Sequence, residues 1–201
     1  GTRGEYGASV TLPVAEDHPT NPKGIYAVTN LTGEKMVLVY HDVHKIPGAC
    51  LRITNTFGPR HQMAHDEYGV VNWFIRKAID DEAIPVFGDG RILRDFLFVD
   101  DVVDCFMQVA YCPQAYGEVF NVGTGTPFNF IDLAKKIVEI AGTGKVTLTE
   151  FTRERKEVEP GDYYTDISKI RRVVGWEPRI DLDEGLRRTI EFYKKHKEEY
   201  W

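Results

Sequence analysis

The feature that most constrains the fold is a long segment of helical periodicity followed by a short apolar segment. In residues 25–44 the apolar side chains recur mostly at the spacing of one helix face, at Val28, Leu31, Val39 and Val43. A mostly apolar run at residues 49–54 follows and ends in a polar loop at 55–69, which is typical of a buried strand. Helix followed by buried strand is the order found in parallel sheets, so we expect an α/β fold.

The second half of the chain alternates helices and short strands in the same way. We expect strands near residues 85–87, 96–99, 119–122 and 145–149, and helices near 70–79, 100–111, 130–140 and 182–201. Asp100 and Asn129 are predicted to cap helices, because their side chains can accept the open N–H groups of a first turn. Residues 153–162 are predicted to form a polar connection.

Composition and charge narrow the classes of function. The net charge is −6 and the basic residues are scattered, so we expect no nucleic-acid partner. The sequence has neither an apolar run of about 18 residues nor a signal-peptide pattern, so we expect no membrane partner. The three cysteines lie far apart, which predicts neither disulfides nor a zinc site and favours the cytoplasm. His61 and His65 stand four apart but without a third ligand in view, so no metal is expected.

Tyr26 and Asn30 are the first candidates for chemistry. Residues four apart on a helix share a face and can point at one ligand. Such a pair taken alone is usually a packing or surface pair, so its interpretation depends on the motifs around it.

Those motifs, in their order along the chain, resemble the extended short-chain dehydrogenases/reductases, the family of the NAD-dependent nucleotide-sugar epimerases and dehydratases. The resemblance covers essentially the whole chain. It is carried by TRGEYG at residues 2–7, PVAEDHPTNP at 13–22, the Tyr26 helix, LRITNTFGPR at 51–60, VFGDG at 86–90, LRDF at 93–96, FVDD at 98–101, FNVG at 120–123, GD at 161–162, DISK at 166–169 and GWEP at 175–178.

The resemblance implies an α/β fold consisting of part of a Rossmann-type doubly wound parallel sheet and a smaller α/β domain that binds the nucleotide sugar. Residues 1–60 would be the last part of the NAD-binding domain. Residues 61–201 would be mainly the substrate domain, with some segments returning to the Rossmann sheet.

The resemblance also assigns catalytic and cofactor-binding residues. Thr2 matches the hydroxyl residue that positions the sugar oxygen, and Tyr26 matches the base that takes its proton as the carbon gives a hydride to NAD. Tyr26, Asn30 and Ile53 would contact the cofactor, and Asn30 stands where the family has a lysine. A cation about 4 Å from a phenolate contributes up to about 4 kcal/mol at an effective dielectric near 20, and Asn supplies none of it. We therefore expect either a slow enzyme with an alkaline optimum or a different use of Asn30.

The nucleotide sugar would be held mainly by residues of the second half. Asn55 would face the diphosphate, and Arg94 would bind it because a guanidinium makes two-point hydrogen bonds to phosphate. The base would lie against Pro85, Val86 and Phe87, with Val70, Val71 and Asp162 nearby. Glu159 stands where many relatives have an arginine, so we expect it to turn away or the phosphates to be held by Arg153 or Arg155.

The function expected is that of a UDP-glucose 4-epimerase-like enzyme with NAD as cofactor, a UDP-sugar or another nucleotide sugar as partner, and a homodimer as assembly. Dehydratases of the family generally have an acid after the hydroxyl residue, whereas Arg3 follows Thr2, which favours epimerisation. The alternatives are an NDP-sugar 4,6-dehydratase, a UDP-glucuronate decarboxylase, and a non-catalytic protein that only binds nucleotide sugars. The family's glycine-rich turn for NAD does not occur in residues 1–201, so we expect a segment upstream of Gly1.

Overall fold

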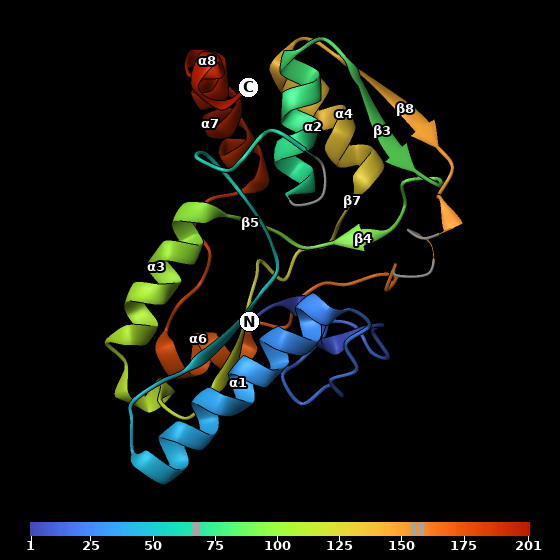
Figure 1. The fold of residues 1–201 in the computed structure, drawn as a ribbon. Helices are drawn as coiled ribbons and strands as arrows, with labels where there is room; N and C mark the ends of the chain where they lie inside the picture. The colour runs from blue at the N-terminus through green and yellow to red at the C-terminus, as the bar shows by residue number, and fades with distance from the viewer. Residues whose placement is uncertain (66–68, 154–155, 157–158) are drawn as a thin grey trace.

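The computed structural model describes residues 1–65, 69–153, 156 and 159–201. Figure 1 shows helix α1 (Ile25–His44), helix α3 (Val99–Ala110) and helix α6 (Ser168–Val174) at one end of the molecule. At the other end lie helices α2 (Val70–Ile79), α4 (Phe130–Ala141), α7 (Leu182–Lys195) and α8 (Lys197–Tyr200). Two short 3-10 helices, η1 (Arg3–Tyr6) and η2 (Pro113–Ala115), lie in the connections.

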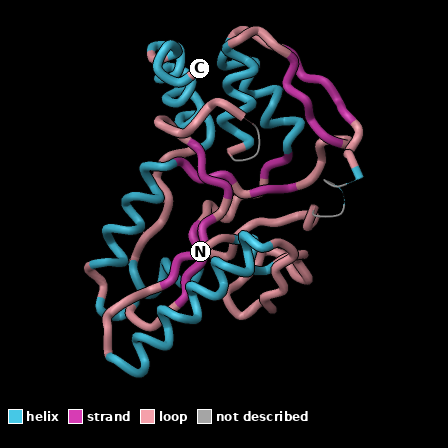
Figure 2. The backbone as a smooth tube through the Cα atoms, viewed as in Figure 1, coloured by secondary structure: helices cyan, strands magenta, loops and turns pink. Residues whose placement is uncertain are grey.

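Most of the described strand pairs are parallel, as expected for an α/β fold. Strand β1 (Cys50–Ile53) pairs with β6 (Val119–Val122), β2 (Asn55–Phe57) with β5 (Phe96–Phe98), and β3 (Ala83–Phe87) with β8 (Lys145–Thr149). One described pair, β4 (Leu93–Arg94) with β7 (Phe128–Asn129), is antiparallel. Figure 2 shows these short strands running through the middle of the molecule and along one side, with helices around them.

The chain path through β1 and β2 changes its neighbour at Thr54. Ile53 pairs with Val122 of β6, whereas Asn55 pairs with Phe96 of β5. Thr54 serves both sides, because its N–H donates to the carbonyl of Val122 at 3.0 Å and its hydroxyl donates to the carbonyl of Asp95 at 2.8 Å. In open α/β sheets, ligands bind beyond the carboxyl ends of strands where the strand order changes, so this point is the natural place for a site.

Two large hydrophobic clusters lie on either side of this point. The first joins α2, α4 and α7 through side chains such as Phe74, Ile137 and Leu186. The second joins β1, β5, β6, α3 and α6 through side chains such as Leu97, Phe120 and Trp176. Helices α2, α4 and α7 therefore bury their apolar faces against the first cluster, and α3 and α6 bury theirs against the second.

Gly185 in α7 marks where this helix approaches the core most closely. A Cβ atom there would lie 2.8 Å from the ring of Phe57 and 2.9 Å from that of Phe98. Alanine normally favours a helix over glycine by about 1 kcal/mol, but overfilling a packed core costs about 1–3 kcal/mol. We expect Gly185→Ala to lower the free energy of unfolding by about 1–2 kcal/mol in urea titrations. Arg187→Ala, on the exposed face of the helix, is the control, and a stabilised Gly185→Ala protein would contradict the packing described.

Several local predictions are confirmed and others are wrong. Strands β6 and β8 and helix α2 have the expected bounds, and Asn129 caps α4 by accepting the N–H of Asp132 at 2.9 Å. Residues 55–57 form strand β2 rather than loop, and the last helical region is divided at His196. The expected cap at Asp100 is wrong, because α3 begins at Val99 and Asp100 lies in its first turn. The predicted connection at 153–162 lies partly outside the described residues.

No helix in the described part of the chain combines the length and the apolar composition needed to cross a membrane.

Candidate functional site

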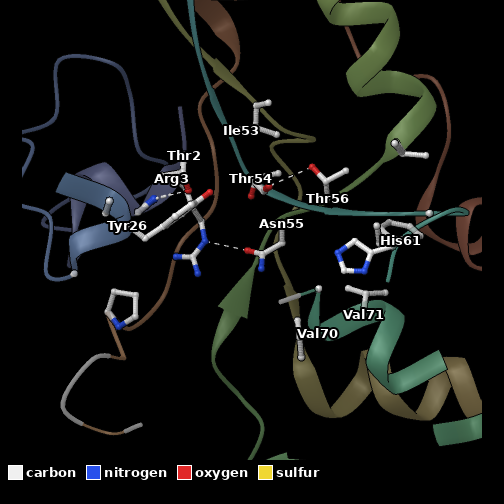
Figure 3. A pocket seen from close by; sticks show the side chains of 18 of the residues that line it. Thr2, Arg3, Tyr26, Ile53, Thr54, Asn55, Thr56, His61, Val70 and Val71 are labelled. Carbon is white, nitrogen blue, oxygen red and sulfur yellow. Dashed lines mark hydrogen bonds between the residues drawn. The ribbon is translucent and has the colours of Figure 1, made fainter. Parts of the chain in front are cut away.

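A cavity of about 850 Å³ opens at the point where the strand path changes partners. Its wall brings together the start of the chain, the first turn of α1, residues 53–61 and the first turn of α2. Of the residues predicted from the sequence to form the site, those that line this cavity are Thr2, Tyr26, Ile53, Asn55, Val70 and Val71. In Figure 3, Thr2, Tyr26, Arg3 and Asn55 lie on one side of it, and His61, Val70 and Val71 lie on the other.

Thr2 is held in place from three directions. Its backbone forms a parallel bridge to Ile53, its N–H donates to Oε1 of Glu5 at 2.9 Å, and its hydroxyl oxygen accepts the N–H of Gly4 at 3.2 Å. This reciprocal arrangement with Glu5 is a capping box at the start of η1. The Thr2 hydroxyl is thereby presented at the cavity with little freedom to rotate.

Tyr26 approaches the same part of the cavity from a different element. It is the second residue of α1 and is 65% exposed, so its phenol is available to a ligand. Figure 3 shows its side chain directed toward Thr2. Two hydroxyl groups on separate elements that face one cavity can hold one sugar oxygen between them.

Asn30 lies one turn further along α1 but does not line this cavity. Its side-chain amide donates to the backbone carbonyl of Tyr26 at 2.8 Å. It lines a separate cavity of about 700 Å³, bounded by α1, α3 and the edge of β1.

Arg3 lines the cavity and was not predicted from the sequence as a binding residue. Its Nε atom donates to Oδ1 of Asn55 at 2.9 Å, and its guanidinium lies 5.4 Å from the centre of the Tyr163 ring. Burial, helped by the nearby cation of Arg94, lowers the pKa of Arg3 to about 10. Its position directly after Thr2 is the sequence feature that could have predicted its place at this site.

Arg94 is buried and does not line the cavity. It donates to the carbonyls of Leu93 and Gly161, at 2.8 and 2.5 Å, and it is paired with the carboxylate of Glu159. Glu159 therefore pairs with the arginine that was expected to bind the diphosphate. Pro160, the residue after Glu159, does reach the cavity wall. Of the two alternative phosphate ligands, Arg153 does not line the cavity and Arg155 lies outside the described residues.

The residues predicted to contact the nucleotide base lie apart from this cavity. Pro85, Val86 and Phe87 belong to strand β3, where Val86 is in the core and the Phe87 ring lies 5.6 Å from that of Phe151. Asp162 accepts the N–H of Leu93 at 2.8 Å, which ties residues 161–162 to β4.

A buried charged cluster formed by Glu5, Glu34 and Arg52 lies behind the part of the cavity wall that contains Thr2 and Tyr26. Arg52 donates from Nε and Nη2 to both carboxylate oxygens of Glu34 at 2.8 Å, and from Nε to Glu5 at 3.2 Å. Burial opposes ionisation of Glu34, but the two hydrogen bonds from Arg52 outweigh it and its pKa is lowered. Burial raises the pKa of Glu5, and the neighbouring Glu34 adds to this effect. The cluster joins η1, α1 and β1, the three elements that carry Thr2, Tyr26 and Ile53.

The remaining polar candidates have structural partners. The side chain of Asp101, in the first turn of α3, accepts the N–H groups of Arg179 and Ile180 at 3.1 and 3.0 Å. It therefore holds the connection before α7 rather than the helix that contains it. Among the described residues, no three His, Cys, Asp or Glu side chains come together as a metal site would require.

Comparison with known proteins places this arrangement in a family. The family model described as GDP-mannose 4,6 dehydratase matches residues 1–189. The chain belongs to the NAD-dependent epimerase/dehydratase family of the extended short-chain dehydrogenases/reductases. It is 35% identical over 192 residues to UDP-glucose 4-epimerase of Mycolicibacterium smegmatis, covering 94% of this chain and 59% of that protein.

Solved structures confirm the Rossmann-type fold expected for this family. UDP-glucose 4-epimerase of Thermotoga maritima with UDP-glucose matches with a TM-score of 0.89 and 30% identity, over 98% of this chain and 62% of that one. UDP-glucuronic acid 4-epimerase of Bacillus cereus, in complex with UDP-glucuronic acid and NAD, matches with a TM-score of 0.85 and 27% identity, over 98% and 60%.

The chain spans about three fifths of the length of UDP-glucose 4-epimerase of Mycolicibacterium smegmatis. Other curated relatives are named dTDP-glucose 4,6-dehydratase and UDP-glucuronic acid decarboxylase. The family is thereby established, together with NAD as its cofactor, and the reaction within the family is a separate question.

Proposed function

We propose that the protein is an NAD-dependent nucleotide-sugar epimerase, similar to UDP-glucose 4-epimerase, that acts by transient oxidation of the sugar at C4. The observation that carries this proposal is that Thr2 and Tyr26, from separate elements, line one cavity with Asn55. That cavity is large enough for a sugar and lies at the change of strand partners, where α/β folds bind ligands.

The proposed roles follow from what each side chain can do. Tyr26 takes the proton of the sugar hydroxyl and later returns it, and Thr2 holds the same oxygen by a hydrogen bond. NAD, when bound, supplies a hydride acceptor at the sugar carbon. The residues present fit its nicotinamide end, since Tyr26 and Ile53 line the cavity from two sides. Asn55, in strand β2, offers its side-chain amide to the substrate as a hydrogen-bonding group.

Epimerisation is favoured over the other reactions of the family by the residue after Thr2. An acid there would serve the elimination of water, whereas the guanidinium of Arg3 keeps its protons at neutral pH and is a poor general acid. Decarboxylation of a UDP-uronic acid is the second candidate reaction, and the cation of Arg3 in the cavity wall favours it over dehydration. A protein that binds nucleotide sugars without turnover is the alternative of another class.

The assembly and location we infer rest on two further observations. Only Ala27 and Glu34 of the twenty residues of α1 are buried, and α1 and α3 expose apolar side chains that include Met36, Val43 and Phe106. We infer that a second copy of the protein covers this apolar face. The three cysteines are unpaired, which fits a reducing cytoplasm.

The test is an assay of the full-length gene product with NAD. We expect the protein to interconvert UDP-sugars that differ at C4. The products are separated and measured by chromatography. Titration calorimetry measures the binding of UDP to the same protein. Binding without any turnover would contradict the epimerase and support the non-catalytic alternative, whereas loss of carbon dioxide from a UDP-uronic acid would support the decarboxylase.

Replacing Asn30 by lysine tests whether a cation at this position would increase the reactivity of Tyr26. A cation about 4 Å from a phenolate favours it by up to about 4 kcal/mol at an effective dielectric near 20. We expect Asn30→Lys to raise kcat at pH 7 by about tenfold or more, with a smaller gain at pH 9. Thr29→Lys is the matched control, because the neighbouring residue points about 100° away around the helix. An unchanged or lower rate for Asn30→Lys would indicate that Asn30 has a role of its own.

A further inference from the structure

Arg3 is a partly buried cation of the cavity wall beside Thr2, and no carboxylate of the described residues forms an ion pair with it. Its Nε atom is bound to the neutral amide of Asn55, and its guanidinium packs near the Tyr163 ring. Within the described part of the chain, its two terminal nitrogens have no hydrogen-bond partner, and no carboxylate lies within ion-pair distance of it. One edge of the guanidinium is therefore free to bind a ligand in the two-point geometry that suits a carboxylate.

The nearby acids that the structure describes are already engaged. Glu159 pairs with Arg94, and Glu5 binds Arg52 and the N–H of Thr2. A partly buried cation is costly unless an anion or a set of hydrogen bonds compensates it. A substrate that brings an anion to the free edge of the guanidinium would therefore compensate Arg3.

The position of Arg3 indicates which part of the substrate carries that anion. Arg3 directly follows Thr2, so their Cα atoms are about 3.8 Å apart. Under the proposed function Thr2 holds the oxygen on C4 of the sugar. In a hexose the carbon bearing C6 is the direct neighbour of C4, whereas the diphosphate is attached at C1, across the ring. Of the two ring neighbours of C4, C3 bears a neutral hydroxyl and C5 bears C6, which is a carboxylate in a uronic acid. An anion of the sugar close to the C4 oxygen is therefore a C6 carboxylate.

We propose that Arg3 binds a carboxylate at C6, and that the preferred substrate is accordingly a nucleotide-linked uronic acid. This inference rests on the proposed function and narrows it to an anionic sugar. Asn55 is a positioning residue, because its side-chain oxygen accepts the hydrogen bond from Nε of Arg3 and leaves the other edge of the guanidinium free. Lysine would supply the charge but not the two-point contact.

The experiment compares UDP, UDP-glucose and UDP-glucuronate on the full-length protein with NAD. Wild type is expected to bind UDP-glucuronate at least about tenfold more tightly than UDP-glucose, as a charged hydrogen bond allows. Arg3→Gln is expected to weaken binding of UDP-glucuronate by about 10- to 100-fold and to leave UDP and UDP-glucose within about threefold. Arg91→Gln, an exposed arginine outside the cavity, is the matched control.

The outcomes separate the two proposals. Equal losses for all three ligands in Arg3→Gln would make Arg3 a diphosphate ligand and overturn the inference. Turnover of UDP-glucose with no preference for UDP-glucuronate would also overturn it while the epimerase proposal stands. Failure of wild type to bind any of the three ligands would overturn both. Retained UDP binding by Arg3→Gln shows that the variant is folded.

Discussion

Replacing Arg52 with methionine is expected to lower the free energy of unfolding by about 3–5 kcal/mol, the largest stability effect that we predict for a single side chain. Arg52 is buried with Glu5 and Glu34, and it also lies 4.7 Å from the centre of the Tyr6 ring. Its removal leaves Glu5 buried without a cation and leaves Glu34 paired only with the exposed ammonium of Lys35, at 3.1 Å. One of them must then take up a proton or draw in water, and either response costs free energy.

The measurement is urea unfolding of the full-length protein at pH 7, with Arg188→Met as the matched control. Arg188 pairs with Glu184 on the exposed side of α7, where an ion pair contributes at most about 1 kcal/mol. A loss below about 1 kcal/mol in Arg52→Met would show that the buried cluster contributes little. Because the cluster joins the elements that carry Thr2 and Tyr26, we also expect kcat of the surviving Arg52→Met protein to fall.

Replacing Tyr26 with phenylalanine is expected to lower kcat by about 10²–10⁴-fold, the loss typical of a missing acid/base group. The ring is retained, and the exposed phenol makes no hydrogen bond within the part of the chain that the structure describes. Stability and the affinity for UDP should therefore stay close to those of wild type. The measurement is single-turnover kinetics with saturating substrate and NAD, which separates the chemical step from binding.

Tyr40→Phe is the matched control for this experiment, because Tyr40 is a half-exposed tyrosine of the same helix outside the cavity. A Tyr26→Phe enzyme with kcat within about threefold of wild type would show that another group moves the proton. Loss of UDP binding in the same variant would instead assign Tyr26 to substrate recognition.

The local structure of this chain was largely predictable because its causes are local. The periodicity of residues 25–44 predicts α1, and the alternation of short apolar runs with turns predicts β6 and β8, because side-chain spacing alone selects these conformations. The same holds for Asn129, whose cap involves a residue only three positions away. Asp100 shows the limit, since a one-residue shift in the start of α3 turns a cap into a first-turn residue.

The candidate site also has a part that local sequence predicts and a part that depends on long-range contacts. By itself, the sequence determined the family and the chain positions of Thr2, Tyr26 and Asn55, because short motifs in a constant order need no knowledge of contacts. Only the tertiary structure decided that Arg94 pairs with Glu159 away from the cavity, that Arg52 joins Glu5 to Glu34, and that Arg3 meets Asn55. These partners lie 18 to 65 residues apart in the chain. Side-chain pairing over such sequence separations depends on which segments the core brings together, and no local pattern encodes it.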